Sequence, residues 1–174
     1  MSEQKKPRVL MYWVLLTATG GAQHTMSLLA EELSYRGYDI VFFTRPPFDP
    51  NHRYISWLKR GNIPVHVLER YEDRPLAQTL ASLAEWIVGI PYGILRGLTL
   101  TEARKVGREF ALARFKRDEE RDIRATFSKF AEEGRREGRP VILHLWGPAL
   151  LTPLLLDWAE AEKIPSIYHE MGEA

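Results

Sequence analysis

Continuous apolar runs are the feature that most constrains how this chain can fold. Three long runs and two shorter ones occur, at residues 9–16, 40–44, 141–146, 63–68 and 166–169. Such runs are typical of strands buried on both faces of a parallel sheet. Helical patterns with one apolar stripe lie between them, at 22–36 and 150–161. The alternation predicts an α/β fold, a Rossmann-like doubly wound parallel sheet of about five strands, with ligands at the carboxyl ends of the strands.

A long segment interrupts this alternation after the third predicted strand. Some 70 residues precede the run at 141–146, far more than a crossover between parallel strands requires. We therefore expect a helical insert at about 72–138. Pro75 suits the first turn of a helix over 76–90, and Thr99 with Glu102 forms a capping-box pattern that opens another helix. Half of the 24 basic residues lie at 102–139, a density typical of a solvated surface helix.

Composition excludes several classes of protein. The 174 residues suit one folded domain, and a formal net charge of +1 gives no global case for nucleic-acid binding. The absence of cysteine excludes a disulfide scaffold, a thiolate metal site and a cysteine nucleophile. No signal peptide is recognised at the polar N-terminus, and no apolar run reaches the ~20 residues of a membrane span. These features predict a cytoplasmic protein.

A pair of glycines follows the first predicted strand. Gly20 and Gly21 lie where a helix begins, and a helix N-terminus with unpaired amides suits phosphate or diphosphate. Glycines there can also allow positive φ, or serve only a tight turn. The dinucleotide fingerprint G-x-G-x-x-G is absent, as is the P-loop, and Arg45 occupies the place of an acidic ribose ligand. NAD binding is therefore not expected.

Two segments of the chain resemble a known enzyme family. The first contains Gly20-Gly-Ala-Gln, then Leu28-Leu-Ala-Glu-Glu-Leu, then Arg36-Gly-Tyr-Asp-Ile-Val. The second contains Ile142-Leu-His-Leu-Trp-Gly-Pro and Ile164-Pro-Ser-Ile-Tyr-His-Glu. In this order and spacing they resemble the N-terminal domain of GT-B glycosyltransferases of family 4. The resemblance covers about 1–70 and 139–174 and leaves the insert unmatched, and Gln23 and Tyr38 depart from the family's usual Glu and His.

The resemblance implies a retaining glycosyltransferase built from two Rossmann-like domains. Residues 1–174 would form the N-terminal, acceptor-side domain, and the C-terminal domain that binds most of the nucleotide-sugar would be absent, so the isolated chain is expected to be inactive. The donor is then a nucleotide-diphosphate-sugar and the acceptor a carbohydrate or a lipid-linked molecule. No other cofactor is expected.

Candidate site residues are assigned in two ways, by matching positions of the family's motifs and by their place at the ends of the predicted strands. By resemblance, His169 is the catalytic candidate, which would contact the transferred sugar or acceptor, and the glycine turn would face the donor diphosphate. A structural role for His169 stays open, as it does for His144 inside the fourth strand. No metal site is expected, because His24, His52 and His66 share no ligand spacing. The substrate-binding candidates are Gly20, Gly21, Ala22, Arg45, Trp146, Gly147 and Glu170.

For two of these candidates, a purely structural role is the alternative to substrate binding. Trp146 can stack on a sugar or simply pack. Arg45 can meet an anionic acceptor or belong to a solvated Arg-Pro-Pro turn. Two other functions also remain: a different nucleotide-dependent enzyme, such as an NADP reductase or sugar epimerase, and a non-catalytic module that docks on a membrane or a partner.

The segment 86–100 carries more apolar surface than a solvent loop should. It contains Trp86, Tyr92 and three glycines, and basic residues lie near it, at positions 96, 104, 105 and 108. Either the segment packs as ordinary core, or it enters the interface of an anionic membrane with its aromatic residues at headgroup depth. The second alternative predicts a peripheral location at the inner face of the membrane.

Overall fold

The computed structural model describes residues 5–14, 16, 20–71, 74–147 and 151–169. It divides the chain into two compact units. One comprises Met1–Leu68 and Arg124–Ala174, and the other comprises Glu69–Ile123. Each unit is described by itself.

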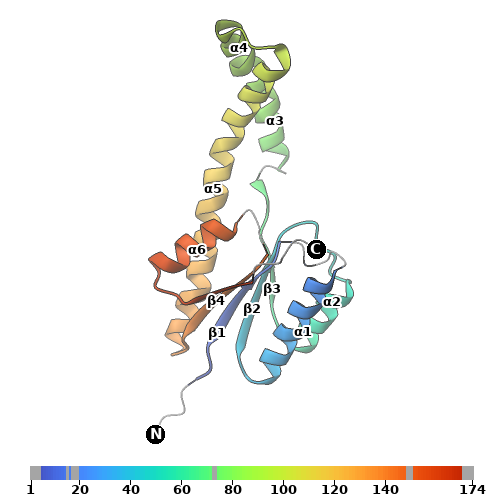
Figure 1. Ribbon diagram of the computed structural model, residues 1–174, viewed down its shortest axis with the longest axis vertical. Helices are drawn as coiled ribbons and strands as arrows, with labels where there is room; N and C mark the ends of the chain where they lie inside the picture. Colours follow the sequence, from blue (N-terminus) through green and yellow to red (C-terminus); the bar gives the residue numbers. More distant parts are fainter. Residues whose placement is uncertain (1–4, 15, 17–19, 72–73, 148–150, 170–174) are drawn as a thin grey trace. The chain divides into compact units, whose positions relative to one another are not determined.

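The first unit is built on a five-stranded sheet in which all strands are parallel (Figure 1). The order is β3-β2-β1-β4-β5, which follows the dinucleotide-binding order 3-2-1-4-5-6 as far as its fifth strand. The predicted α/β, Rossmann-like fold is therefore confirmed. The strands are β1 (Arg8–Tyr12), β2 (Asp39–Thr44), β3 (Val65–Val67), β4 (Val141–Trp146) and β5 (Ser166–His169).

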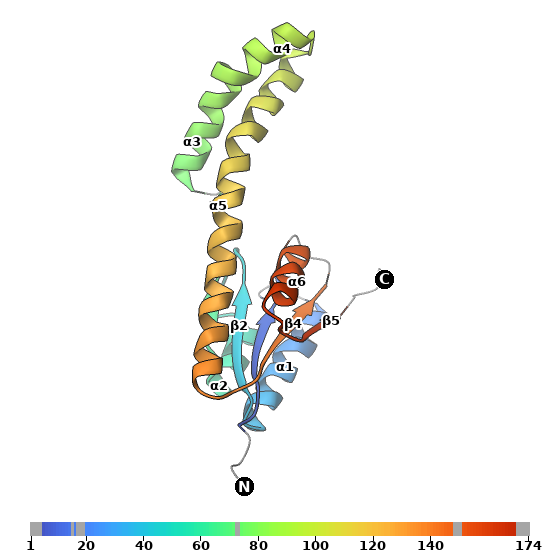
Figure 2. The ribbon, with the colours of Figure 1, turned by 90° about the vertical axis from the view of Figure 1, so that its left-hand side faces the viewer.

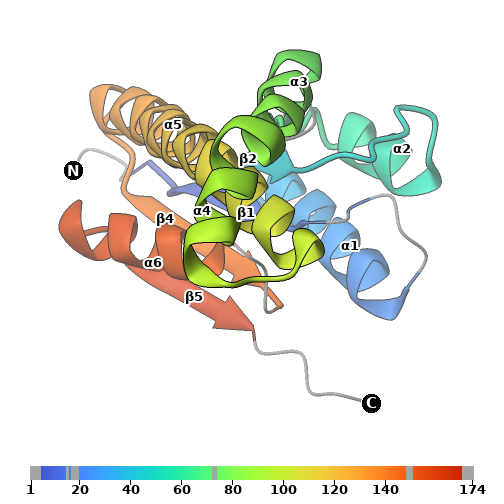
Figure 3. The ribbon, with the colours of Figure 1, turned by 90° about the horizontal axis from the view of Figure 1, so that it is seen from above.

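Helices cover both faces of this sheet (Figure 3). On one face, α1 (Gly21–Tyr35) and α2 (Arg53–Arg60) pack Met26, Ala30 and Ile55 into a core with Phe42. The next residue, Phe43, points to the other face because side chains alternate along a strand. There its ring lies 4.2 Å from that of Phe127. This second layer is formed by α6 (Thr152–Ala161) and by the C-terminal part of α5 (Leu100–Arg136).

The part of α5 from Arg124 onward therefore belongs to the sheet unit and serves as the crossover helix before β4. Phe127 and Ala131 are fully buried, and the Trp158 indole of α6 donates a hydrogen bond to Ser128 Oγ at 2.9 Å. The expectation of a solvated helix describes the charged residues of α5 but not this apolar stripe. Replacing Phe127 by Ala would cost about 3–5 kcal/mol, as is usual for a buried aromatic side chain.

The second unit contains a helical hairpin (Figure 2). Its first arm is α3 (Pro75–Ala84), a π-helical turn η2 (Glu85–Gly89) and α4 (Ile90–Arg96), and its second arm is the first part of α5. The predicted helix start at Pro75 and the capping box are confirmed. Thr99 N–H donates to Glu102 Oε2 at 2.9 Å, and Glu102 N–H donates to Thr99 Oγ1 at 3.4 Å.

Small residues hold the two arms of the hairpin at close range. A Cβ on Gly89 would lie 2.3 Å from Ala103 O, and a Cβ on Gly107 would lie 2.3 Å from Ala84 O. A Cβ on Gly93 would likewise lie 2.2 Å from the Cβ of Ala103. Gly97, with φ 65°, ends α4 in the left-handed region, where glycine is strongly favoured. Among the described residues, no helix carries an apolar stretch of the length that crossing a bilayer requires.

Candidate functional site

The candidate site lies at the carboxyl edge of the sheet, where the direction of winding reverses. β1 is paired with both β2 and β4, so the connections after β1 and after β4 leave in opposite directions. The amino edge is closed instead by ion pairs. Arg8, which is buried at the start of β1, contacts Asp39 at 2.6 Å and Glu137 at 3.1 Å. A ligand therefore has its natural place at the carboxyl edge.

The glycine turn forms the start of α1, and its N-cap residue provides no side-chain cap. Gly20 is the N-cap residue, with φ −177° and ψ 162°, and it has no side chain to accept a hydrogen bond from the first turn. Gly21 is helical, and a Cβ there would meet no atom within 4 Å. Neither glycine has positive φ, so the expectation that they serve such a conformation is wrong. What they provide is main chain without side chains at the start of α1. The Gln23 side chain lies against this turn, because a Cβ on Gly20 would be 2.5 Å from Gln23 Oε1.

A fully buried tyrosine fixes this turn from α2. The Tyr54 hydroxyl donates to Gly20 O at 3.2 Å and accepts a hydrogen bond from Arg53 Nη2 at 2.9 Å. The ring of Trp57 in the same helix packs against His24, with centroids 5.1 Å apart. No helix was predicted over Arg53–Arg60, so Tyr54 was not among the predicted site residues. The one signal was the apolar spacing of Tyr54, Ile55 and Leu58.

Three aromatic side chains form a cluster at the ends of β4 and β5. Trp146 and His169 are register partners, and their rings stack with centroids 4.3 Å apart at 19°. The imidazole of His144 lies 5.0 Å from that of His169. Of the three, His169 is exposed, whereas Trp146 and His144 are buried. The stack therefore holds one exposed imidazole in a defined orientation.

His144 is neutral at physiological pH. Burial, together with the neighbouring His169, lowers the pKa of His144 to about 4. Within the described part of the chain, His144 Nε2 and Trp146 Nε1 have no hydrogen-bond partner. A buried polar atom without a partner is costly, so this cluster has unused hydrogen-bonding capacity next to His169.

Gly147, which follows β4, has a conformation that requires glycine. Its φ is 70°, its N–H donates to His169 O at 2.9 Å, and its own carbonyl accepts from the Thr152 hydroxyl at 3.2 Å. This one residue links the ends of β4 and β5 to the start of α6. The positive φ expected at Gly20 and Gly21 thus occurs at Gly147.

The remaining predicted residues are placed as follows. Arg45 directly follows β2, but it is only 4% exposed, and its N–H donates to Val14 O at 3.3 Å. The alternative of a solvated Arg-Pro-Pro turn is therefore wrong for this side chain. Ala22 lies half-buried in the first turn of α1. Glu170 lies outside the described residues.

Across the described ranges, no three His, Asp or Glu side chains group as metal ligands would.

The glycine turn and the aromatic cluster share a face as well as an edge of the sheet. Trp146 belongs to the same core as Met26 and Ala30 of α1, so its ring lies on the face that α1 covers. His144 and His169 contact that ring. An anion at the N-terminus of α1 and a polar group beside His169 can therefore belong to one ligand site.

Comparison with known proteins gives no assignment: no protein-family model, no curated protein and no solved structure matches the chain. The similarity to GT-B glycosyltransferases therefore rests on the sequence motifs quoted above, and it stays a prediction.

Proposed function

We propose that this chain is the acceptor-binding half of a retaining glycosyltransferase that uses a nucleotide-diphosphate-sugar. The observation that carries the proposal is the placement of the exposed His169 and of the uncapped glycine turn on one face and one edge of a Rossmann-like sheet. The sequence motifs that contain these two elements are the ones that resemble family 4.

Each element of the site has a proposed role. The N–H groups of Gly21 and Ala22 face the donor diphosphate, since a helix N-terminus attracts negative charge. His169 donates a hydrogen bond to the transferred sugar or to the acceptor hydroxyl, where charge develops in the transition state. Trp146 acts through His169, because its buried indole stacks on that imidazole instead of presenting a face to the sugar.

Transfer requires a donor-binding half in addition to these residues. A single wall of a cleft cannot align a sugar donor with its acceptor, and alignment supplies a large part of such a rate enhancement. The chain alone is thus inactive in this proposal, and a separate donor-binding domain, covalently joined or supplied in trans, completes the enzyme. The acceptor is a carbohydrate or a lipid-linked molecule.

The test measures sugar transfer with the chain alone and with a donor-binding half supplied. Radiolabelled nucleotide-diphosphate-sugars are incubated with a glycan and lipid extract, the chain, and each Rossmann-like donor half that the same genome encodes. We expect label in product only when both halves are present. Robust transfer by the chain alone would contradict the two-half proposal. Binding of free NADP, with no transfer by any pair, would favour a reductase or epimerase instead.

A further inference from the structure

The closed end of the hairpin carries many large apolar side chains that are exposed. Leu95 is 85% exposed, Ile94 76%, Ile87 69% and Trp86 60%. Tyr92, Leu98 and Leu100 are also exposed, and all seven residues lie between 86 and 100. The alternative in which this segment packs as ordinary core therefore does not describe these side chains. We refer to these seven residues as the apolar tip.

The exposure follows from how the hairpin is built. The face that joins its arms contains Ala103 and three glycines, Gly89, Gly93 and Gly107. A Cβ added at any of these glycines would meet the opposite arm at 2.2–2.3 Å. Because the small residues take up the contact face, the large side chains of α4 are directed away from it. The tip is thus an outward-facing surface of a closely packed scaffold.

The charges around the tip are suited to an anionic surface. Arg96 is the one charged residue between 86 and 101, and it lies over the Tyr92 ring at 5.7 Å. Arg104 lies over the Trp86 ring at 5.4 Å. Glu85, the nearest acidic group before the tip, is paired with Arg104 at 2.9 Å and Arg108 at 3.3 Å. From 85 to 109 the chain has four basic and three acidic residues, which leaves a net charge of +1, and Lys105 lies 3.9 Å from Glu109.

We propose that the apolar tip docks into the headgroup interface of an anionic bilayer. Tyr and Trp favour this depth because each has an apolar ring and a polar end, and Arg side chains reach from it to lipid phosphate. A protein partner would need a matching shape, whereas a bilayer accepts a projecting apolar surface with basic residues beside it. No described helix could span the bilayer, so the tip lies in the interface. The proposal does not depend on the glycosyltransferase assignment.

The test uses the full chain and vesicles of phosphatidylcholine mixed with phosphatidylglycerol. The expected result is co-sedimentation that weakens at least tenfold when ionic strength rises from about 0.05 M to about 0.5 M, since salt screens the Arg–phosphate attraction. Vesicles of phosphatidylcholine alone should bind much less. Replacing Ile94 and Leu95 together by Ser should weaken binding at least tenfold, without unfolding the chain, because both side chains are exposed.

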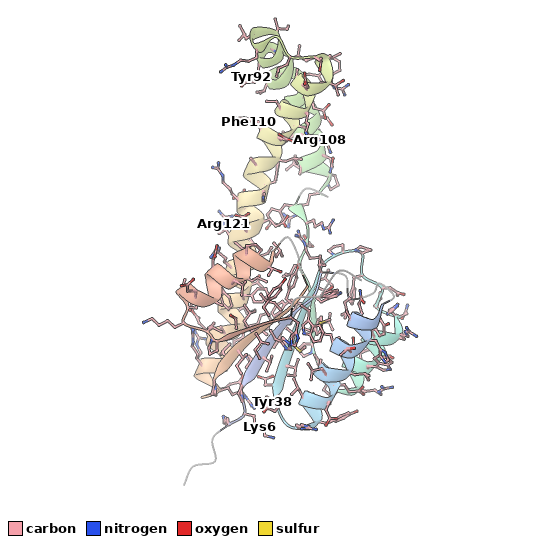
Figure 4. The ribbon with its side chains drawn as sticks, viewed as in Figure 1. Lys6, Tyr38, Tyr92, Arg108, Phe110 and Arg121 are labelled. Atoms are coloured by element: carbon pink, nitrogen blue, oxygen red, sulfur yellow. The ribbon has the colours of Figure 1, made fainter. Side chains whose placement is uncertain are left out.

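Matched controls lie on the same unit but away from the tip. Figure 4 shows Tyr92 at the closed end of the hairpin, with Phe110 and Arg121 successively further along α5. Phe110 is 69% exposed, so Phe110→Ser removes a comparable apolar group. Arg121→Gln is the control for Arg96→Gln. Both controls should leave binding within twofold, whereas Arg96→Gln should weaken it severalfold and reduce its salt sensitivity.

A site-specific probe distinguishes lipid from a protein partner. Because the chain has no cysteine, Leu95→Cys and Phe110→Cys can each carry a single polarity-sensitive fluorophore. The label at 95 should shift to the blue on anionic vesicles, and the label at 110 should not. Absence of binding at low salt would overturn the proposal. So would a dimer in light scattering that the Ile94 and Leu95 replacement dissociates, because the tip would then be a contact between copies.

Discussion

Trp146 and His169 face each other across neighbouring strands, in register and with their rings stacked 4.3 Å apart. The buried indole leaves the imidazole few orientations, so an exposed histidine at a strand end is held in place before any substrate arrives. Preorganisation of this kind is what a hydrogen-bond donor to a transition state needs.

Replacing His169 by Ala should lower the rate of transfer by about 10²-fold or more in the enzyme completed by its donor half, as loss of one preorganised donor does. The melting temperature should hardly change, because the side chain is exposed. The matched control is Tyr168→Ala, a half-exposed neighbour that points to the opposite face of the sheet. An unchanged rate for His169→Ala would make the residue structural.

The stability of the sheet unit should depend on pH through His144. Its pKa is about 4 in the folded chain and near 6.5 when unfolded. The unfolded state therefore binds more protons between these values, so stability is complete above pH 6.5 and falls until pH 4. Between pH 7 and pH 5 the unfolding free energy should fall by about 2 kcal/mol. Urea titrations measure this fall.

The variant His144→Gln should remove most of this pH dependence, because its side chain stays neutral. His24→Gln is the control, since His24 is exposed and should leave the dependence intact. If His144→Gln and the unaltered chain lose equal stability between pH 7 and pH 5, another group is responsible.

Removing the Tyr54 hydroxyl should loosen the glycine turn. Tyr54→Phe keeps the buried ring but loses the hydrogen bonds with Gly20 and Arg53. We expect a loss of about 1 kcal/mol in the unfolding free energy and faster amide exchange at His24, whose N–H donates to Gly20 O at 3.3 Å. In the control, Tyr35→Phe, an exposed side chain loses its hydroxyl contact with Glu31, which Arg60 continues to hold, and the change should stay within about 0.5 kcal/mol.

Adding one methyl group at Gly107 should separate the arms of the hairpin. The new Cβ would meet backbone atoms of Ala84 and Gly89 at 2.3 and 2.8 Å, so Gly107→Ala should cost about 1–3 kcal/mol, the usual range for overpacking. Gly21→Ala, where the added carbon meets open space, should be neutral or slightly stabilising. Helicity by circular dichroism and protease resistance measure the difference; equal effects of both substitutions would contradict the close packing.

Local sequence patterns were sufficient to predict much of the fold. Buried strands such as β1 and β4 are continuous apolar runs, and the Thr99–Glu102 capping box marks a helix start because its two hydrogen bonds depend on local spacing. The short helix α2 was missed, because eight residues, three of them basic, make only about two helical turns, too few to establish a period. The π-helical turn η2 lies inside the helix predicted over 76–90, and no local pattern marked it.

The candidate site was less predictable than the fold. Strand ends indicated Trp146 and His169 separately, but their stacking depends on the register of β4 with β5, which no local pattern encodes. The burial of Arg45 and the role of Tyr54 likewise depend on tertiary packing.

Because the hairpin arms approach closely, some positions of one short segment should accept only glycine, whereas their neighbours should accept many residue types. At Gly89 and Gly93 nearly every substitution meets the other arm, so these positions should tolerate almost no variation in a saturation library selected for folding. Ile94 and Leu95, one and two residues further on, touch little and should accept polar, charged and apolar residues alike under that selection. A second selection, for localisation in the cell, should then restrict Ile94 and Leu95. Comparing the substitutions that each selection tolerates would distinguish residues that build the hairpin from residues whose side chains it exposes for binding.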